Sequence, residues 1–296
     1  MERNLIVGMG EILWDILPEG KQLGGAPVNF TYHVSQLGLN ALAVSAVGHD
    51  ALGDEILSVL CSRNMEHRIF KVDFPTGTVN VTLDTAGVPS YEICEGVAWD
   101  NIPADKSLIG IAHDTAAFCF GTLAQRNEIS RRAIRSFLEL MPQNDDVLKI
   151  YDINLRQHFY SYEIIKESMR LCNILKINDD EYIVLSEMFG LPINDLVAGA
   201  RRLISEFNLK TVIVTCGATG SYAVTVDDAS WLPTPKVEVR DTVGAGDSFT
   251  ATFIGAWLSG MGLREAHCLA VDVAAYVCSC SGAMPQLPES LKQRLG

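Results

Sequence analysis

Asp241-Thr-Val-Gly-Ala-Gly-Asp-Ser-Phe-Thr-Ala251 is the stretch of this 296-residue chain that decides its fold. It follows a strand-like run, 236–239, and opens an apolar segment, 248–258, that we expect to be helical. Gly244-Ala245-Gly246 leave the backbone bare, so their N–H groups and a helix N-terminus with roughly half a unit of positive charge can hold an anion. Asp247 adds a carboxylate to that turn. An anion site beside a candidate base suits phosphoryl transfer to a hydroxyl, although an Asp-capped helix after a glycine turn would also explain the pattern.

The same stretch resembles the second signature of the PfkB/ribokinase family of carbohydrate kinases at each key position. In that family the residue matching Asp247 is the catalytic base, and the amides matching Gly244, Ala245 and Gly246 form the anion hole. The resemblance implies an ATP-dependent sugar kinase. It also implies an α/β fold, a ribokinase-like three-layer sandwich whose mostly parallel central sheet is flanked by helices and carries a small β-sheet lid.

The composition is that of an ordinary globular enzyme, with 48% hydrophobic and 20% charged residues. A net charge of −13 argues against nucleic acid or an anionic membrane surface as the main partner. The N-terminus leads straight into a strand-like run with no secretory signal, and no apolar run approaches the roughly 20 residues of a membrane helix. The eight cysteines show no paired zinc spacing. We therefore expect free thiols and a cytoplasmic protein.

Short strand patterns alternate with helical ones along the chain. The predicted strands are 4–8, 41–47, 114–119, 147–151, 173–177, 211–215 and 221–226. The predicted helices are 27–37, 52–62, 126–140, 161–171, 179–189, 195–207, 247–259 and 264–280. Alternation at this spacing predicts βαβ units and a mainly parallel sheet covered on both faces.

One region departs from this alternation. Two strand-like runs, 78–83 and 88–93, are joined by an expected turn at 84–87 and predict a hairpin outside the main sheet. We expect a single kinase domain, 1–296, whose lid comprises segments of about 10–23 and 70–100. Val79, Val81 and Leu83 alternate with polar residues and form one apolar side of the hairpin. We expect that side to be buried. Since lids of related kinases often pair across a two-fold axis, the resemblance implies a homodimer through the lid.

A second glycine-rich site is Gly24-Gly-Ala-Pro-Val-Asn-Phe30. Its glycines allow a close backbone approach, Pro27 suits the first turn of a helix, and Asn29 can bond a diol; a plain turn and helix cap would also explain it. The family's first signature pairs two glycines with a following Asn and an upstream acid. By that match Asp15, Gly25 and Asn29 bind the sugar. The Gly-Gly-Ala-Pro form is most similar to the fructokinase branch, which implies D-fructose; ribose, 2-keto-3-deoxygluconate and nucleosides remain alternatives.

Two polar motifs follow predicted strands. Asp152-Ile-Asn-Leu-Arg156 resembles the family's Asp-x-Asn-x-Arg, so Arg156 could reach the sugar or its nascent phosphate, or pair with a surface carboxylate. Asn178-Asp-Asp-Glu181 reads as a helix cap with a capping-box-like pair. It also matches the family's Asn-x-x-Glu beside the nucleotide, whose Glu holds Mg²⁺ through water. Magnesium keeps several waters, so one protein carboxylate suffices.

Two further segments match the family's nucleotide site. Val214–Tyr222 has neither Walker nor dinucleotide spacing. It resembles the Thr-x-Gly-x-x-Gly that borders the nucleotide, which implies roles for Thr215, Gly217 and Gly220. The segment 275–285 resembles the one that closes over adenine and contains Cys278, although an apolar core helix with a glycine cap fits it equally.

The resemblance also implies a monovalent cation site. Family members often bind K⁺ beside the anion hole through carbonyls near the positions of Asp241, Val243 and Gly282. The expected small molecules are thus a sugar, ATP, Mg²⁺ and K⁺, and the expected product is a sugar 6-phosphate. A sugar-binding regulator without catalysis is the alternative from another class, but Asp247, Asn178 and Glu181 are all present.

Overall fold

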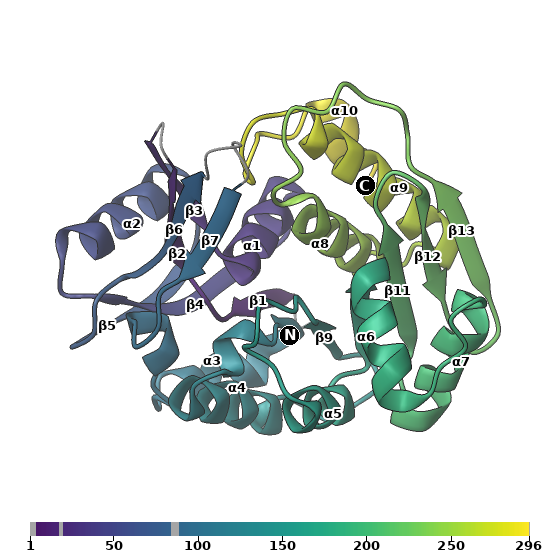
Figure 1. The fold of residues 1–296 in the computed structure, drawn as a ribbon, viewed down its shortest axis with the longest axis horizontal. Helices are drawn as coiled ribbons and strands as arrows, with labels where there is room; N and C mark the ends of the chain where they lie inside the picture. The colour runs from purple at the N-terminus through teal and green to yellow at the C-terminus, as the bar shows by residue number, and fades with distance from the viewer. Residues whose placement is uncertain (1–3, 18–19, 84–88, 296) are drawn as a thin grey trace.

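The computed structural model describes residues 4–17, 20–83 and 89–295. Its main sheet has nine strands in the order β13-β12-β11-β10-β9-β8-β1-β4-β5 (Figure 1). Their bounds are β1 Leu5–Met9, β4 Ala41–Gly48, β5 His67–Val72, β8 Thr115–Phe120, β9 Leu148–Asp152, β10 Ile174–Asn178, β11 Thr211–Cys216, β12 Gly220–Val224 and β13 Ala229–Pro233. In this order the seven strands β11, β10, β9, β8, β1, β4 and β5 pair in parallel. The strand β12 pairs antiparallel with both β11 and β13. The mainly parallel sheet is therefore confirmed.

Helices cover both faces of this sheet. They are α1 Ala26–Gln36, α2 Ala51–Ser62, α3 Leu108–Asp114, α4 Glu128–Leu140, α5 Tyr162–Leu171, α6 Asp179–Phe189, α7 Leu196–Phe207, α8 Ala245–Leu258, α9 Leu263–Cys278 and α10 Glu289–Lys292, with short 3₁₀ turns η1 Ala98–Asn101 and η2 Leu123–Gln125. Alternate residues of β8 point into different cores. Phe118 stacks on Phe137 of α4 and belongs to the core that also contains residues of α7, whereas Cys119 belongs to the core that contains residues of α1, α8 and α9. This gives the expected three layers.

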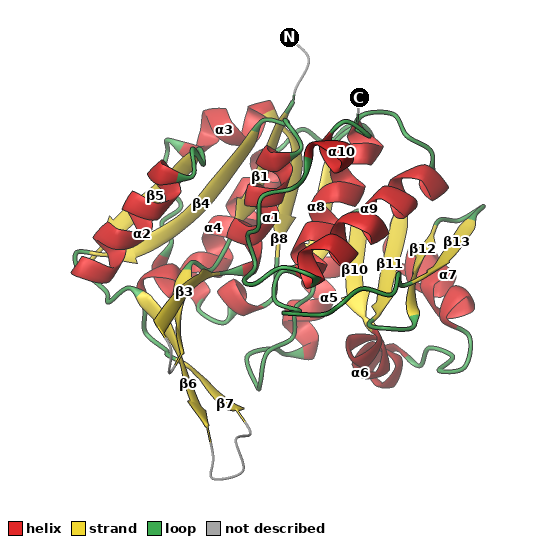
Figure 2. Cartoon of the chain, turned by 90° about the horizontal axis from the view of Figure 1, so that it is seen from above, coloured by secondary structure: helices red, strands yellow, loops and turns green. Residues whose placement is uncertain are grey.

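A smaller sheet stands apart from the main one. Its strands are β2 Leu13–Leu17, β3 Gly20–Gly24, β6 Gly77–Leu83 and β7 Pro89–Ile93, in the order β3-β2-β6-β7. Figure 2 shows β6 and β7 projecting away from the helices and main sheet. The predicted hairpin is confirmed as β6 and β7; its expected turn at 84–87 lies outside the described residues.

Some elements differ from the predictions. The run 236–239 is not a strand: it pairs with no described strand, and Val239 is 61% exposed. The strands β2 and β5 were not predicted because neither alternates apolar with polar residues in a clean period of two. β5 is an edge strand and carries His67, Arg68 and Lys71, which suits an edge but hides the strand pattern. β3, β13, α3 and α10 are short elements that were also missed.

Candidate active site

The glycine turn, residues 244–247, forms the N-cap and the first turn of α8. Gly244 is the N-cap residue and has φ 77°, a left-handed conformation that favours glycine. A Cβ at Gly244 would lie 2.6 Å from the Ala283 carbonyl oxygen. In this turn the amide of Ala245 donates to the Thr242 carbonyl (3.3 Å), and those of Gly246 and Asp247 have no acceptor among the described residues. The start of α8 can therefore accept an anion.

Asp247 lies in that first turn and is half-buried. Its Oδ2 accepts a hydrogen bond from Asn29 Nδ2 at 2.8 Å, although the two residues are 218 positions apart in sequence. Burial and the nearby Asp152 carboxylate raise the pKa of Asp247 to about 7, against the opposing effect of the Asn29 bond. A carboxyl group with this pKa is suited to accept a proton near neutral pH.

A buried lysine lies beneath the glycine turn. Lys176 in β10 forms an ion pair with Asp152 at the end of β9, with Nζ and Oδ1 3.1 Å apart. Its Nζ would be 2.9 Å from a Cβ on Gly246. Burial lowers the pKa of Lys176, but the carboxylates of Asp152, Glu181 and Asp247 raise it, and the net shift is upward. Lys176 was not among the predicted site residues, although a lysine within a largely apolar strand is a usable signal.

Asn178 and Glu181 form the predicted capping box at the start of α6. Asn178 Oδ1 accepts the Glu181 amide and Glu181 Oε2 accepts the Asn178 amide, both at 2.8 Å. Glu181 Oε1 also accepts the Leu155 amide at 2.9 Å, so this buried carboxylate ties the loop after β9 to α6.

The same carboxylate bears on the expected magnesium ion. Each oxygen of Glu181 keeps a second acceptor position for water. No cluster of three or more His, Cys, Asp or Glu suited to a metal occurs within the described residues. This donor set fits an ion bound through water and substrate phosphates rather than one held by the protein alone.

The first signature brings its residues together around the start of α1. Gly25 is the N-cap, with φ 119°, and a Cβ there would lie 2.3 Å from the Glu11 carbonyl oxygen. Asp15 in β2 lies beside Gly24, since a Cβ on Gly24 would be 2.4 Å from Asp15 Oδ2. Burial raises the pKa of Asp15 to about 6. Asn29 is buried, and its Oδ1 has no partner in the described part of the chain, so it can accept a hydrogen bond from a hydroxyl group.

Glu11 is a second buried group that was not among the predicted site residues. Its Oε1 accepts the Ala26 amide at 3.3 Å, while Oε2 has no described partner. Burial raises the pKa of Glu11, and the charge of Arg156 opposes that shift. Glu11 precedes β2 by only two residues, but nothing in its local sequence marks it as buried.

Arg156 is exposed in the loop after β9 and donates to the Leu155 carbonyl at 3.0 Å. Arg156 forms no ion pair with a carboxylate among the residues the structure describes, which gives no support to the surface-pair alternative. The positive charge of Arg156 partly opposes the rise in the pKa of Asp247 and of Glu11. Arg156 is thus near enough to the two signatures to affect both.

The predicted nucleotide residues lie at the ends of the neighbouring strands β10 and β11, in the turn that follows β11, and at the end of α9. Asn178 and Thr215 are register partners in the parallel pair β10 and β11. Gly217 has φ 50° and open space on its Cβ side, whereas a Cβ on Gly220 would lie 2.5 Å from the Leu232 carbonyl oxygen. Cys278 ends α9, and its carbonyl accepts the amides of Arg240 (2.9 Å) and Asp241 (3.3 Å).

Asp241, Val243 and Gly282 are the three residues expected at a cation site, and the carboxylate of Asp241 holds the other two. Its Oδ1 accepts the Val243 amide and its Oδ2 accepts the Gly282 amide, both at 3.0 Å. Within the described ranges no residue donates to the backbone carbonyls of Asp241, Val243 or Gly282. These three carbonyl oxygens therefore have no described hydrogen-bond donor that would compete with a cation.

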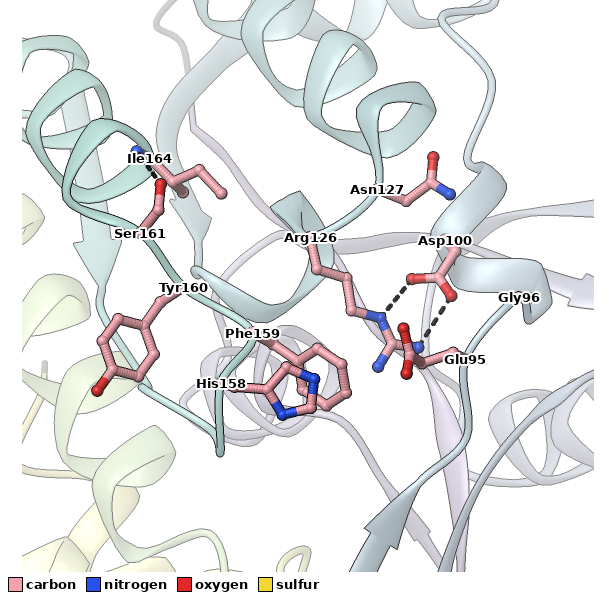
Figure 3. Close-up of a pocket in the computed structure, with 10 residues that line it drawn as sticks. All are labelled: Glu95, Gly96, Asp100, Arg126, Asn127, His158, Phe159, Tyr160, Ser161 and Ile164. Atoms are coloured by element: carbon pink, nitrogen blue, oxygen red, sulfur yellow. Dashed lines mark hydrogen bonds and ion pairs between the residues drawn. The ribbon is translucent and has the colours of Figure 1, made fainter.

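A cavity of about 260 Å³ lies near the end of β7 and contains none of the predicted site residues (Figure 3). Arg126 lines it and donates to both carboxylate oxygens of Asp100, at 2.7 and 2.9 Å, and to the Cys94 carbonyl. The guanidinium lies over the rings of Trp99 (4.1 Å) and Phe159 (4.5 Å). This buried network ties the chain leaving the smaller sheet to the loop after β9.

The sequence profile described as pfkB family carbohydrate kinase matches residues 19–290. The chain belongs to the PfkB family of carbohydrate kinases. This kinase is 28% identical to an ATP-dependent 6-phosphofructokinase of Thermoanaerobacterium thermosaccharolyticum, over 91% of this chain and 83% of that protein. It is 26% identical to a fructokinase of Klebsiella pneumoniae, over 95% of each chain.

Solved structures support the fold of this kinase. A fructokinase double mutant of Vibrio cholerae O395, solved with fructose, ADP and a potassium ion, superposes with a TM-score of 0.76. The match covers 100% of this chain and 99% of that one, at 20% identity. The predicted ribokinase-like fold is therefore confirmed, and the family match confirms the predicted sugar kinase class. None of the helices in the described residues is long and apolar enough to cross a membrane.

Proposed function

We propose that this sugar kinase transfers the γ-phosphoryl group of ATP to the O6 hydroxyl of D-fructose and releases fructose 6-phosphate and ADP. The observation that carries the proposal is the 2.8 Å hydrogen bond between Asn29 and Asp247, because it joins the two signatures at one point. The Gly-Gly-Ala-Pro form at 24–27 and the fructokinase relatives favour fructose.

In this mechanism Asp247 accepts the proton of the sugar hydroxyl as its oxygen attacks the γ-phosphorus. The bond from the γ-phosphorus to the β–γ bridging oxygen breaks, and ADP carries away the electron pair. The amides of the 244–247 turn hold the charge on the transferring group, and the ammonium of Lys176 beneath Gly246 adds to that stabilisation.

The remaining residues bind the reactants. Asp15, Gly25 and Asn29 would hold the sugar, and Arg156 would contact the sugar or its nascent phosphate. ATP would lie along the residues at the ends of β10, β11 and α9, which are Asn178, Thr215, Gly217, Gly220 and Cys278.

Two ions would support the site. Glu181 would hold Mg²⁺ through water, and this ion would neutralise charge on the phosphates. The carbonyls of Asp241, Val243 and Gly282 would bind K⁺ and keep the glycine turn in order.

The decisive experiment measures sugar-dependent ADP release over a panel of D-fructose, D-ribose, 2-keto-3-deoxygluconate, adenosine and fructose 6-phosphate. The last substrate is included because one relative is a 6-phosphofructokinase. We expect D-fructose to give the highest kcat/KM. A panel led by another acceptor would refute the assignment to fructose, and no turnover with any acceptor would favour a sugar-binding regulator.

We further propose one kinase domain over 1–296, in which the smaller sheet closes as a lid over the sugar and excludes water. Val79 of β6 is buried by the chain's own core, but β6 and β7 extend beyond it (Figure 2). We infer that a second copy covers the rest, which gives a homodimer through the lids. The eight free cysteines suit a cytoplasmic protein.

Sedimentation at micromolar concentration tests the dimer. The unmodified protein should sediment as a dimer, and combining Val81→Asp with Leu83→Asp should release monomer and lower activity. A monomeric unmodified protein would contradict the dimer but not lid closure, because a lid can fold onto its own subunit.

A further inference from the structure

One face of α1 carries two side chains that reach across to the glycine turn and its surroundings. Asn29 donates to Asp247, and His33, one helical turn later, bonds the carbonyl oxygen of Ala283 through Nε2 at 2.8 Å. His33 is fully buried. Because a carbonyl oxygen only accepts, Nε2 must carry the hydrogen. Burial also lowers the pKa of His33 to about 4, so the ring is neutral near pH 7.

Ala283 is the residue against which the glycine turn packs. A Cβ on Gly244 would lie within 2.8 Å of the Ala283 carbonyl oxygen, Cα and Cβ, so the two backbones are in direct contact. The N-cap of α8 therefore depends on where Ala283 is held.

Side chains from three different parts of the chain hold successive backbone groups of segment 282–284. The Gly282 amide donates to Asp241 Oδ2, His33 donates to the Ala283 carbonyl, and Arg63 Nη1 donates to the Met284 carbonyl at 3.0 Å. His33 belongs to α1, and Arg63 is the C-cap residue of α2. Two helices on one face of the sheet thus fix the surface on which the turn rests.

We propose that His33 is a positioning residue for phosphoryl transfer: its Nε2–H holds segment 282–284 against Gly244 and so fixes the amides of the 244–247 turn. The inference rests on the proposed function, in which these amides hold the transferring phosphoryl group. Helix α1 then positions two parts of the active site. Asn29 orients the carboxylate of Asp247, and His33 holds the turn that binds the phosphoryl group. His33 touches neither reactant.

The test compares His33→Leu, which removes the donor at similar volume, with His33→Gln, whose amide can still donate to Ala283. A misplaced turn should lower kcat of His33→Leu by about 10- to 100-fold. The KM for sugar should stay within about threefold, because Asn29 and Asp15 are untouched. His33→Gln should recover most of kcat.

His267→Leu is the matched control. His267 is equally buried, its pKa is also lowered by burial to about 4, and it bonds Ser221 (2.8 Å) and Ser230 (2.9 Å) on β12 and β13. Its loss should reduce stability without a selective fall in kcat, which separates positioning from general damage to the core.

Hydrogen exchange of the hydrogen-bonded amides of this turn, those of Val243, Ala245 and Ser248, gives a readout that does not depend on turnover. Exchange should rise in His33→Leu, return toward normal in His33→Gln and stay unchanged in His267→Leu. If His33→Leu does not fold, Arg63→Met removes the neighbouring bond from an exposed side chain and should raise exchange to a smaller extent.

Each outcome decides the proposal. Unchanged exchange and kcat in His33→Leu, a glutamine variant no better than leucine, or, where His33→Leu does not fold, unchanged exchange in Arg63→Met would overturn it. If the unmodified protein phosphorylates no sugar, the proposed function fails, whereas the exchange comparison still decides whether His33 positions the turn.

Discussion

Replacing Asp247 by Asn removes the proposed base while keeping its size and its ability to accept from Asn29 Nδ2. We expect turnover to fall by at least ~10² while sugar binding survives. The same change should alter stability in a pH-dependent way. In the folded protein the pKa of Asp247 is raised by burial from 3.8 to about 7, so ionising this carboxyl group opposes folding.

The size of that effect follows from the shift. At about 1.36 kcal/mol per pKa unit, the ionised group costs the folded state on the order of 4 kcal/mol well above pH 7. Because the folded-state pKa is the higher one, this contribution to stability is complete below about pH 3.8 and is lost as the pH rises through about 7. Water at the half-buried carboxyl group reduces the effect, so the loss between about pH 5 and 8 should be roughly 1–3 kcal/mol.

Urea denaturation of both proteins at several pH values measures this difference. The free energy of unfolding of Asp247→Asn, minus that of the unmodified protein, should increase with pH over this range. Asp227→Asn, an exposed change between β12 and β13, is the control and should show no such trend. A difference that stays constant with pH would refute the raised pKa, and near-normal turnover would refute the role as base.

Three other predictions test different parts of the site. Lys176→Met should lower kcat by about 10-fold or more, because the cation beneath Gly246 is lost, and kcat for the best acceptor measures it; an unchanged kcat would remove Lys176 from the mechanism. Asp15→Asn should raise the sugar KM by about 10-fold with a smaller change in kcat, and equal effects on both would contradict a binding role. Activity should be higher in K⁺ than in Na⁺ at matched ionic strength, because the proposed site at the carbonyls of Asp241, Val243 and Gly282 binds K⁺; equal rates in the two salts would argue against that site.

The parts of the fold that could be predicted were those with local signals. Helix α6 was predicted with its observed bounds because Asn178 and Glu181 form a capping box within four residues. The glycine turn at 244–246 was recognised for a similar reason: glycines, an acid and a following apolar helix are adjacent in sequence. Such features depend on neighbours along the chain, so the sequence is sufficient to find them.

The parts that were missed depend on contacts between distant segments. Lys176 became part of the site only because β9 lies next to β10 and brings Asp152 within 3.1 Å. The run 236–239 looked like a strand, but no described strand pairs with it. Alternation predicts a tendency, and a neighbouring strand decides whether it is realised.

The hydrogen bond between Asn29 and Asp247 has a consequence for the kinase when no sugar is present. A carboxyl group with a pKa of about 7 holds its proton in about half of the molecules at pH 7. Those molecules cannot take a proton from water, and in the others one carboxylate oxygen is already engaged by Asn29. Protonation therefore lowers by about half the fraction of sugar-free molecules whose Asp247 can take a proton from water, which slows ATP hydrolysis in the absence of an acceptor.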